Sequence, residues 1–450
     1  MVNGEIGPTL KSMTIPMIVG MIMLMTFSLV DTFFVSLLGT DQLAALSFTF
    51  PVTFTLISLN IGLGIGTSAI IGRYLGSGET QHAKALATGA LMLSVVLVGL
   101  LAIVGIYSID IIFGWMGATP ELMVYIRAYM IPWFLAGVFL AIPMVGNSVL
   151  RASGDTKTPS IIMAACGAIN AILDPILIFG WGPVPAMGIQ GAAIATAVAW
   201  AVGVVWILYL LAFQRKLMEP RVLSWSEFSH ASSGVLKIGL PAAGANMLTP
   251  IAGGVLTATV ATYGAEAVAA WGVGNRLESI ASIMVLALSM SLPPFISQNY
   301  GANNYARIKQ AFEMCAKFVI IWQLGVFAVM AALAAPIASV FAEERSVARA
   351  ITLFLYILPL GYGLQGIIIL TNSSFNAMHK PMAALALSII RLFVCYVPIA
   401  YLGSHFYGLI GLFWGCVIAN VITAVLSYFW FYRSLKKDLA ETYQTNKPTH

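Results

Sequence analysis

The chain contains a succession of long, continuous apolar runs, and no other feature limits its possible folds so strongly. A helix needs about 20 mostly apolar residues to cross the hydrocarbon core of a bilayer. Polar breaks divide the chain into twelve runs of that kind. They cover roughly 12–38, 43–72, 84–108, 122–146, 158–179, 188–213, 234–262, 267–297, 307–335, 348–372, 381–402 and 407–432. None alternates with the period of two that barrel strands show, so we expect an all-α polytopic membrane protein with twelve transmembrane helices.

The charged residues agree with a chain embedded in lipid. Only 9% of the 450 residues are charged, whereas a soluble domain carries about 25%. Seventeen Lys and Arg residues fall on one side of the predicted membrane, against three on the other. Because basic residues collect on the cytoplasmic side, we expect an inner-membrane protein with both termini in the cytoplasm. The basic residues form no clustered face, so nucleic acid is not an expected partner.

The sequence lacks the motifs of several enzyme classes. Its four cysteines fall singly inside apolar runs, which favours small core residues over a disulfide framework or a metal site. No phosphate-binding G-x-x-x-x-G-K-[ST] loop, H-E-x-x-H or G-x-S-x-G motif occurs. We therefore expect neither an enzyme nor a bound cofactor, and any transport would draw on an ion gradient or on the gradient of the substrate.

The two halves of the chain repeat one another. Several landmarks recur in the same order at an offset of 225, which falls to 220 near the end: Pro16 and Pro241, Gly76 and Gly301, Asn147 and Asn372, then Gly188 and Gly408. Six crossings per half make the repeats parallel, related by an axis along the membrane normal. Such pairs enclose a cleft with the substrate near the midplane.

The repeat predicts the domain organisation. We expect an amino-terminal lobe over 1–213, a cytoplasmic connection over 214–233 and a carboxy-terminal lobe over 234–432. The polar remainder, 433–450, is expected to be a flexible cytoplasmic tail.

Three acidic residues lie inside the apolar runs and away from their ends, namely Asp31, Asp174 and Glu278. A charge at the bilayer centre costs about 2.5–3.5 kcal/mol even on lenient scales, so such residues are candidates for function. Asn170 precedes Asp174 by four residues and shares its helix face, and Pro175 loosens the backbone beside it. These oxygen ligands suit a proton relay or a small hard cation such as Na⁺. The alternative is a set of satisfied polar contacts between helices.

The candidate coupling residues belong to the first half alone. Leu256 stands opposite Asp31 in the repeat, and the eleventh run contains no acid. Pro16 lies in the same run as Asp31 and removes one helical hydrogen bond. We hypothesise that protonation of Asp31 changes the bend of this helix; a static kink is the alternative.

A second group of polar residues occupies the carboxy-terminal half. Glu278 and Arg276 are two positions apart and so face different sides of a helix; each is expected to find another partner or to line the polar cavity. Gln365 and Asn246 favour hydrogen bonds between helices over ligand binding. Arg391 in the eleventh run could pair with Glu278 or extend its charge toward the membrane surface.

Several motifs together resemble one transporter family. They are V-D-T-F-F-V-S-L-L-G at 30–39, Y-L-G-S-G-E-T-Q-H-A at 74–83, N-S-V-L-R-A-S-G-D-T-K-T-P at 147–159 and G-A-A-I-A-T at 191–196. In this order the chain resembles the multidrug and toxic compound extrusion (MATE) transporters over essentially its whole length, and the DinF-like branch most. The resemblance implies two pseudo-two-fold related six-helix bundles in a V. It also implies antiport of amphipathic, often cationic molecules against H⁺ or Na⁺.

The resemblance also implies a site. Asp31, Asn170, Asp174 and Thr196 would form the cation site, and Pro16 the bending point of the first helix. The other main bacterial branch carries acids in the seventh and tenth spans, where this chain has none, so a carboxy-lobe Na⁺ site is not expected.

The sequence favours a monomeric exporter over two alternatives. A lipid-linked precursor flippase of the same superfamily would need a cationic cleft, and only Arg276 and Arg391 are not assigned to either side of the membrane. An intramembrane transferase would need a paired catalytic motif, and none is found.

Overall fold

A computed structural model describes residues 1–445, and 446–450 lie outside the described part. Nearly all of the described chain is helical, which confirms the all-α class. The one β pairing within residues 1–445 is an isolated bridge between Trp181 and Val184 in a loop.

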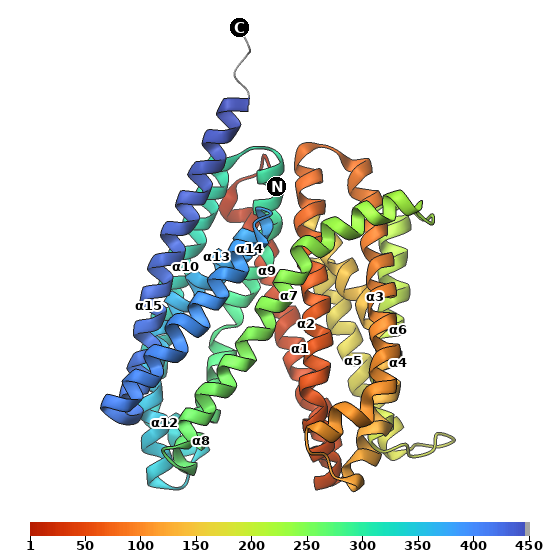
Figure 1. The fold of residues 1–450 in the computed structure, drawn as a ribbon. Coiled ribbons are helices and arrows are strands. Elements are labelled where there is room, and N and C mark those ends of the chain that lie inside the picture. The colour runs from red at the N-terminus through yellow and green to blue at the C-terminus, as the bar shows by residue number, and fades with distance from the viewer. Residues whose placement is uncertain (446–450) are drawn as a thin grey trace. The chain divides into compact units, whose positions relative to one another are not determined.

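Each of the six predicted runs in the first half is a helix (Figure 1). They are α1 (Ile6–Ser36), α2 (Thr40–Ser77), α3 (Thr80–Trp115), α4 (Pro120–Ala152), α5 (Lys157–Phe179) and α6 (Ile189–Tyr209), which continues into the π-helix η1 (Leu210–Gln214). Several of these helices extend past the predicted runs by one or two polar turns, since the hydrocarbon core limits only the apolar part of a helix.

The helices of the second half are more often interrupted. They are α7 (Trp225–Ala261), α8 (Ala265–Ala281), α9 (Ile283–Gly301), α10 (Tyr305–Ala332), α11 (Ala334–Phe341), α12 (Arg345–Ile357), α13 (Tyr362–Ala377), α14 (Pro381–Ile389) and α15 (Val397–Thr445), with a 3₁₀ turn η2 (Leu358–Gly361) and a π-helix η3 (Ile390–Tyr396). Helices α8 and α9 are bent by 43° at the break between them.

The helices account for twelve membrane crossings. By length and composition, ten stretches of the described residues can cross a membrane, and the bent pair α8–α9 makes an eleventh. The stretch Pro381–Thr442 has 62 residues, about 93 Å at 1.5 Å per residue, against a hydrocarbon core of about 30 Å. Its helix is broken at Tyr407 and at Gly408, whose φ of 62° suits glycine. This stretch therefore supplies two crossings.

The chain forms two compact units, described separately below. The amino-terminal unit comprises Ser12–Ala243, and the carboxy-terminal unit comprises Met1–Lys11 together with the chain from Gly244. Helices α1 and α7 thus each contribute to both units, and Pro16 and Pro241 lie within five residues of the two division points. The predicted lobes, 1–213 and 234–432, place the boundaries in the loops instead.

Helices α2 and α7 approach closely, backbone to backbone, within the amino-terminal unit. A Cβ atom placed on Gly62 would lie 2.3 Å from the carbonyl oxygen of Gly239, and one on Gly66 would lie 2.5 Å from that of Val235. Small residues allow this approach, and membrane helices use it widely because lipid tails are as apolar as the helix surface.

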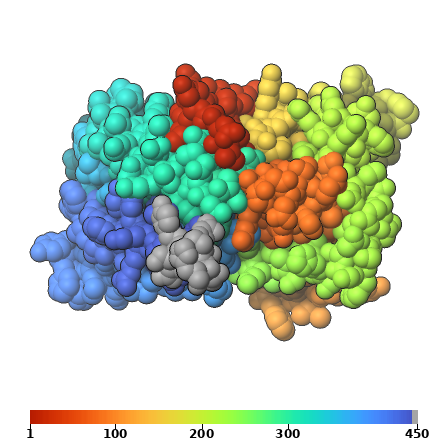
Figure 2. Space-filling view, turned by 90° about the horizontal axis from the view of Figure 1, so that it is seen from above, coloured from red at the N-terminus to blue at the C-terminus, as the bar shows by residue number. Residues whose placement is uncertain are grey.

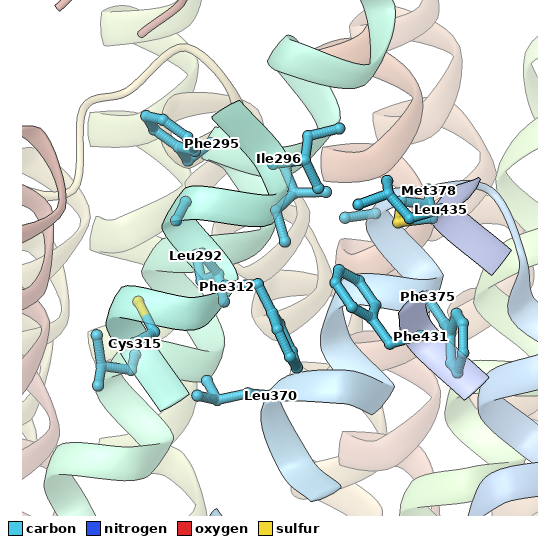
Figure 3. Close-up of a cluster of buried hydrophobic side chains, with 14 of the residues drawn as sticks. Leu292, Phe295, Ile296, Phe312, Cys315, Leu370, Phe375, Met378, Phe431 and Leu435 are labelled. Atoms are coloured by element: carbon cyan, nitrogen blue, oxygen red, sulfur yellow. The ribbon is translucent and has the colours of Figure 1, made fainter. Parts of the chain in front are cut away.

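A cluster of aromatic and aliphatic side chains forms one core of the carboxy-terminal unit (Figure 3). The rings of Phe312 and Phe431 stack with centroids 4.0 Å apart. Leu10 of α1 belongs to the same cluster, and the Arg307 guanidinium donates to the carbonyl oxygens of Met1 and Gly4. Figure 2 shows these first residues, in red, beside the teal surface of this unit. The start of the chain is therefore fixed to its second half.

The segment after Tyr432 differs from the flexible tail that we predicted. Helix α15 continues to Thr445, and Lys380 Nζ lies 2.6 Å from Oδ1 of Asp438 and 2.6 Å from the Ser434 hydroxyl. The polar composition of this segment predicted a frayed tail. The ion pair instead holds this part of α15 beside Lys380, directly before α14. The prediction for 446–450 lies outside the described residues.

Candidate functional site

Helices α1 and α5 lie side by side in a fixed register. The Thr156 hydroxyl donates to the carbonyl oxygen of Met13 at 2.8 Å, and the Ser160 hydroxyl contacts Met17 Sδ at 3.8 Å. Both pairs differ by 143 in residue number, so the helices run parallel and rise together. Asp31 and Asp174 also differ by 143. The register set near one end of the helices therefore brings the two acids together further along.

The carboxyl groups of Asp31 and Asp174 interact electrostatically with one another. Asp174 is fully buried, and Asp31 is half-buried. Among the described residues no donor reaches Oδ1 of Asp31 or either carboxylate oxygen of Asp174. Ionised carboxylates only accept hydrogen bonds, so the two groups can bond only when one carries a proton. A proton or a cation between them would satisfy oxygens that are otherwise orphaned.

Two further polar side chains adjoin the acids. The Asn170 amide nitrogen donates to the Thr196 hydroxyl at 3.1 Å, and that hydroxyl donates to the carbonyl oxygen of Ala192 at 3.0 Å. These bonds leave the Asn170 carbonyl oxygen as its free ligand atom. The buried Tyr129 of α4 interacts electrostatically with both acids. The donor set is made of oxygens, which fits H⁺ or Na⁺ and not a transition metal; the described residues contain no cluster of three metal-binding acids, histidines or cysteines.

Pro16 lies beside the contact that sets the register. It interrupts the helical hydrogen-bond ladder of α1, and the Thr156 hydroxyl bonds the carbonyl of Met13, three residues earlier. The Thr156 side chain, directly before α5, thus supports the turn of α1 that the proline weakens.

The second group of predicted residues is only partly assembled. Gln365 donates through its amide to Oε1 of Glu278 at 3.0 Å, joining α13 to α8. Arg276 is exposed, and no bond from it to the other three is present in the described chain. Asn246 on α7 has a buried amide nitrogen without a partner among these residues.

The MatE family profile matches the chain twice, over residues 16–176 and 241–402. The chain belongs to the MATE family of transporters. The two matches begin 225 residues apart (241 − 16), the offset found from the paired landmarks. Each half therefore carries the family's repeat.

Known relatives of this MATE transporter cover it almost completely. A FAD transporter of Shewanella oneidensis is 39% identical over 99% of this chain and 98% of its own length. The probable multidrug resistance protein YoeA of Bacillus subtilis is 28% identical over 89% of this chain and 88% of its own. The crystal structure of the Vibrio cholerae MATE transporter VcmN in a bent form superposes with a TM-score of 0.91 at 35% identity, covering 96% of this chain and 97% of that one. The fold and the membrane-transporter class follow.

Two residues near the site were absent from our sequence-based candidates. Tyr129 lies in a long apolar run with several other aromatic residues, and nothing in its spacing separates it from them. Thr156 lies in a polar loop and acts through a bond to a residue 143 positions away. Only the packing of α1 and α4 around α5 identifies them.

Proposed function

We propose that this MATE transporter exports amphipathic, often cationic small molecules by antiport against H⁺, with Na⁺ as the alternative coupling ion. Asp31 and Asp174 bind that ion, and Asn170 and Thr196 shape the site. One observation carries the proposal: two acids interact inside the membrane-spanning part, and three of their four oxygens are buried without a donor among the described residues.

The carboxyl pair supplies a physical basis for coupling. With one proton the two groups share a hydrogen bond and a single negative charge, whereas without it two like charges confront each other in a poorly solvated place. Their repulsion acts between α1 and α5, and Pro16 weakens the same helix α1 15 residues (31 − 16) before Asp31. Release of the ion therefore shifts the equilibrium between two conformations of α1. Transport of a substrate that binds one of these conformations more tightly is thereby coupled to the ion.

Na⁺ would be held differently from H⁺. It needs several oxygen ligands at once, so both carboxylates and the Asn170 carbonyl oxygen would converge on it. A proton needs only the pair. An imposed pH gradient and an imposed Na⁺ gradient therefore separate the two ions.

A flavin dinucleotide is a second candidate substrate. The observation in its favour is the 39% identity, over 99% of this chain, with a protein named for FAD transport. We further propose an inner-membrane location with both termini in the cytoplasm, on the distribution of Lys and Arg. We also propose that the exporter is a monomer.

The test is ethidium efflux from proteoliposomes under an imposed pH or Na⁺ gradient. We expect Asp31→Asn and Asp174→Asn to reduce gradient-driven efflux at least tenfold, since the amide cannot be protonated in this range. Asp41→Asn, at the exposed start of α2, is the matched control and should retain the wild-type rate. Efflux by Asp31→Asn at the wild-type rate under both gradients would contradict the proposal.

A further inference from the structure

Arg391 lies near the middle of the eleventh crossing, in the carboxy-terminal unit. Arg391 follows the start of α14 at Pro381 by ten residues, about 15 Å along a helix and half of a bilayer core of about 30 Å. Its Nε is buried without a hydrogen-bond partner, and the described residues provide no hydrogen bond or ion pair to this side chain. A charge kept in such a place without a bonding partner is expensive, which makes it a candidate for ligand binding.

Glu278 is the acidic residue that interacts electrostatically with Arg391, but it does not contact the guanidinium. No salt bridge joins the two side chains within the described chain. The Glu278 carboxylate is held by Gln365 instead. Tyr396 is likewise directed to the thiol of Cys416. The guanidinium therefore keeps its donors available, with a compensating charge nearby.

The backbone is irregular around these side chains. Arg391 and Tyr396 lie in the π-helix η3, and such segments are frequent at functional sites. The break between α8 and α9 falls four residues after Glu278, at Ser282. The 3₁₀ turn η2 ends directly before Tyr362, whose buried hydroxyl has no partner among the described residues and which also interacts with Glu278. Three helices thus depart from regular geometry at one place.

The internal repeat relates this place to the carboxyl pair. Pro159 and Pro381 occupy the first turns of the fifth and eleventh crossings, at an offset of 222. The same offset carries Asp174 to Tyr396, and it carries Asn170 to the residue after Arg391. The second half therefore has no acid at these positions, and it carries a guanidinium one residue before the counterpart of Asn170.

We propose that Arg391 binds an anionic group, a phosphate or a carboxylate, of an amphipathic substrate. A planar guanidinium matches either group through two parallel N–H···O bonds, and the Tyr362 hydroxyl supplies a further donor near Glu278. Glu278 balances the charge of Arg391 when no anion is bound. The inference deepens the proposed export function and rests on it, since it names a chemical class of substrate.

Three probes separate anion recognition from binding of the ring system. FAD carries two phosphates, riboflavin carries the same isoalloxazine ring without them, and ethidium is a cation. Binding to the purified protein in lipid nanodiscs is measured by fluorescence without any ion gradient. We expect Arg391→Gln to weaken FAD binding at least tenfold, because a charge-assisted hydrogen bond is lost, and to leave riboflavin and ethidium within twofold.

Two control variants separate the loss of the Arg391 guanidinium from a general effect of removing a charge. Arg349→Gln removes an exposed guanidinium from α12 of the same unit and should leave all three affinities unchanged. Arg391→Lys retains the charge without the planar fork, so it should weaken FAD binding by a smaller factor, and it serves if Arg391→Gln does not fold. FAD binding by Arg391→Gln within twofold of wild type, or an equal loss for all three probes, would overturn the proposal. A failure of ion coupling would change ethidium efflux and leave this selectivity intact.

Discussion

The contact between Gly167 and Phe27 offers a direct test of how α1 and α5 position the acids. A Cβ atom placed on Gly167 would lie 2.1 Å from Cδ2 of Phe27. Ordinary van der Waals contact begins at 3.4 Å, so the shortfall is 1.3 Å (3.4 − 2.1). Either the ring swings away or α1 moves from α5 by about 1 Å, and overpacking of this kind typically costs about 1–3 kcal/mol.

A displacement of that size is large on the scale of the ion site. Phe27 lies about one helical turn from Asp31, and an O–H···O hydrogen bond tolerates heavy-atom separations of only about 2.5–3.0 Å. We therefore expect Gly167→Ala to reduce gradient-driven ethidium efflux at least tenfold in proteoliposomes. The protein should remain folded, as judged by its elution as a single species in size-exclusion chromatography.

A compensating change separates sterics from other causes. Phe27→Leu shortens the opposing side chain, so the double variant Gly167→Ala/Phe27→Leu should recover most of the lost efflux. Gly99→Ala is the matched control, since the nearest atom to its Cβ would be Val138 Cγ2 at 3.9 Å. If Gly167→Ala transports like Gly99→Ala, or if shortening Phe27 restores nothing, the packing argument is wrong.

Two further predictions concern stability, measured as the thermal unfolding midpoint in detergent. Gly62→Ala should destabilise by about 1–3 kcal/mol, because its Cβ would meet the backbone of Gly239 at 2.3 Å; Gly244→Ala has no atom within 4 Å and should be neutral or stabilising, so equal midpoints would contradict the reasoning. Asp438→Asn should lower stability by about 1–3 kcal/mol, because it removes the carboxylate 2.6 Å from Lys380 Nζ; an unchanged midpoint would mean that the last turns of α15 add nothing.

The two halves share a scaffold and differ in what they place at its centre. Asp31 and Asp174 lie within the amino-terminal unit, whereas Arg391 and Glu278 lie within the carboxy-terminal unit. Duplication supplies equivalent helices, but the charged residues stand at different positions in the two halves: Leu256 is opposite Asp31, and Tyr396 is opposite Asp174. Under the two proposals, the carboxyl pair binds the coupling ion and Arg391 binds an anionic group of the substrate.

The sequence by itself determined the crossings, the duplication and the residues inside the membrane. Hydrophobic length and the cost of an unpaired charge in lipid are local properties, so runs of about 20 apolar residues and single acids such as Asp31 can be recognised without knowing their neighbours. The repeat needs only ordered landmarks at a fixed offset, and the two family matches reproduce that offset.

Only the tertiary structure decided which of those residues meet. The register of α1 on α5 depends on Thr156 and on the space at Gly167, and that register brings Asp31 to Asp174. The bond from Gln365 to Glu278 and the docked end of α15 likewise join segments far apart in the chain. Such contacts arise from shape and from the pairing of individual donors and acceptors, which hydrophobic periodicity does not encode.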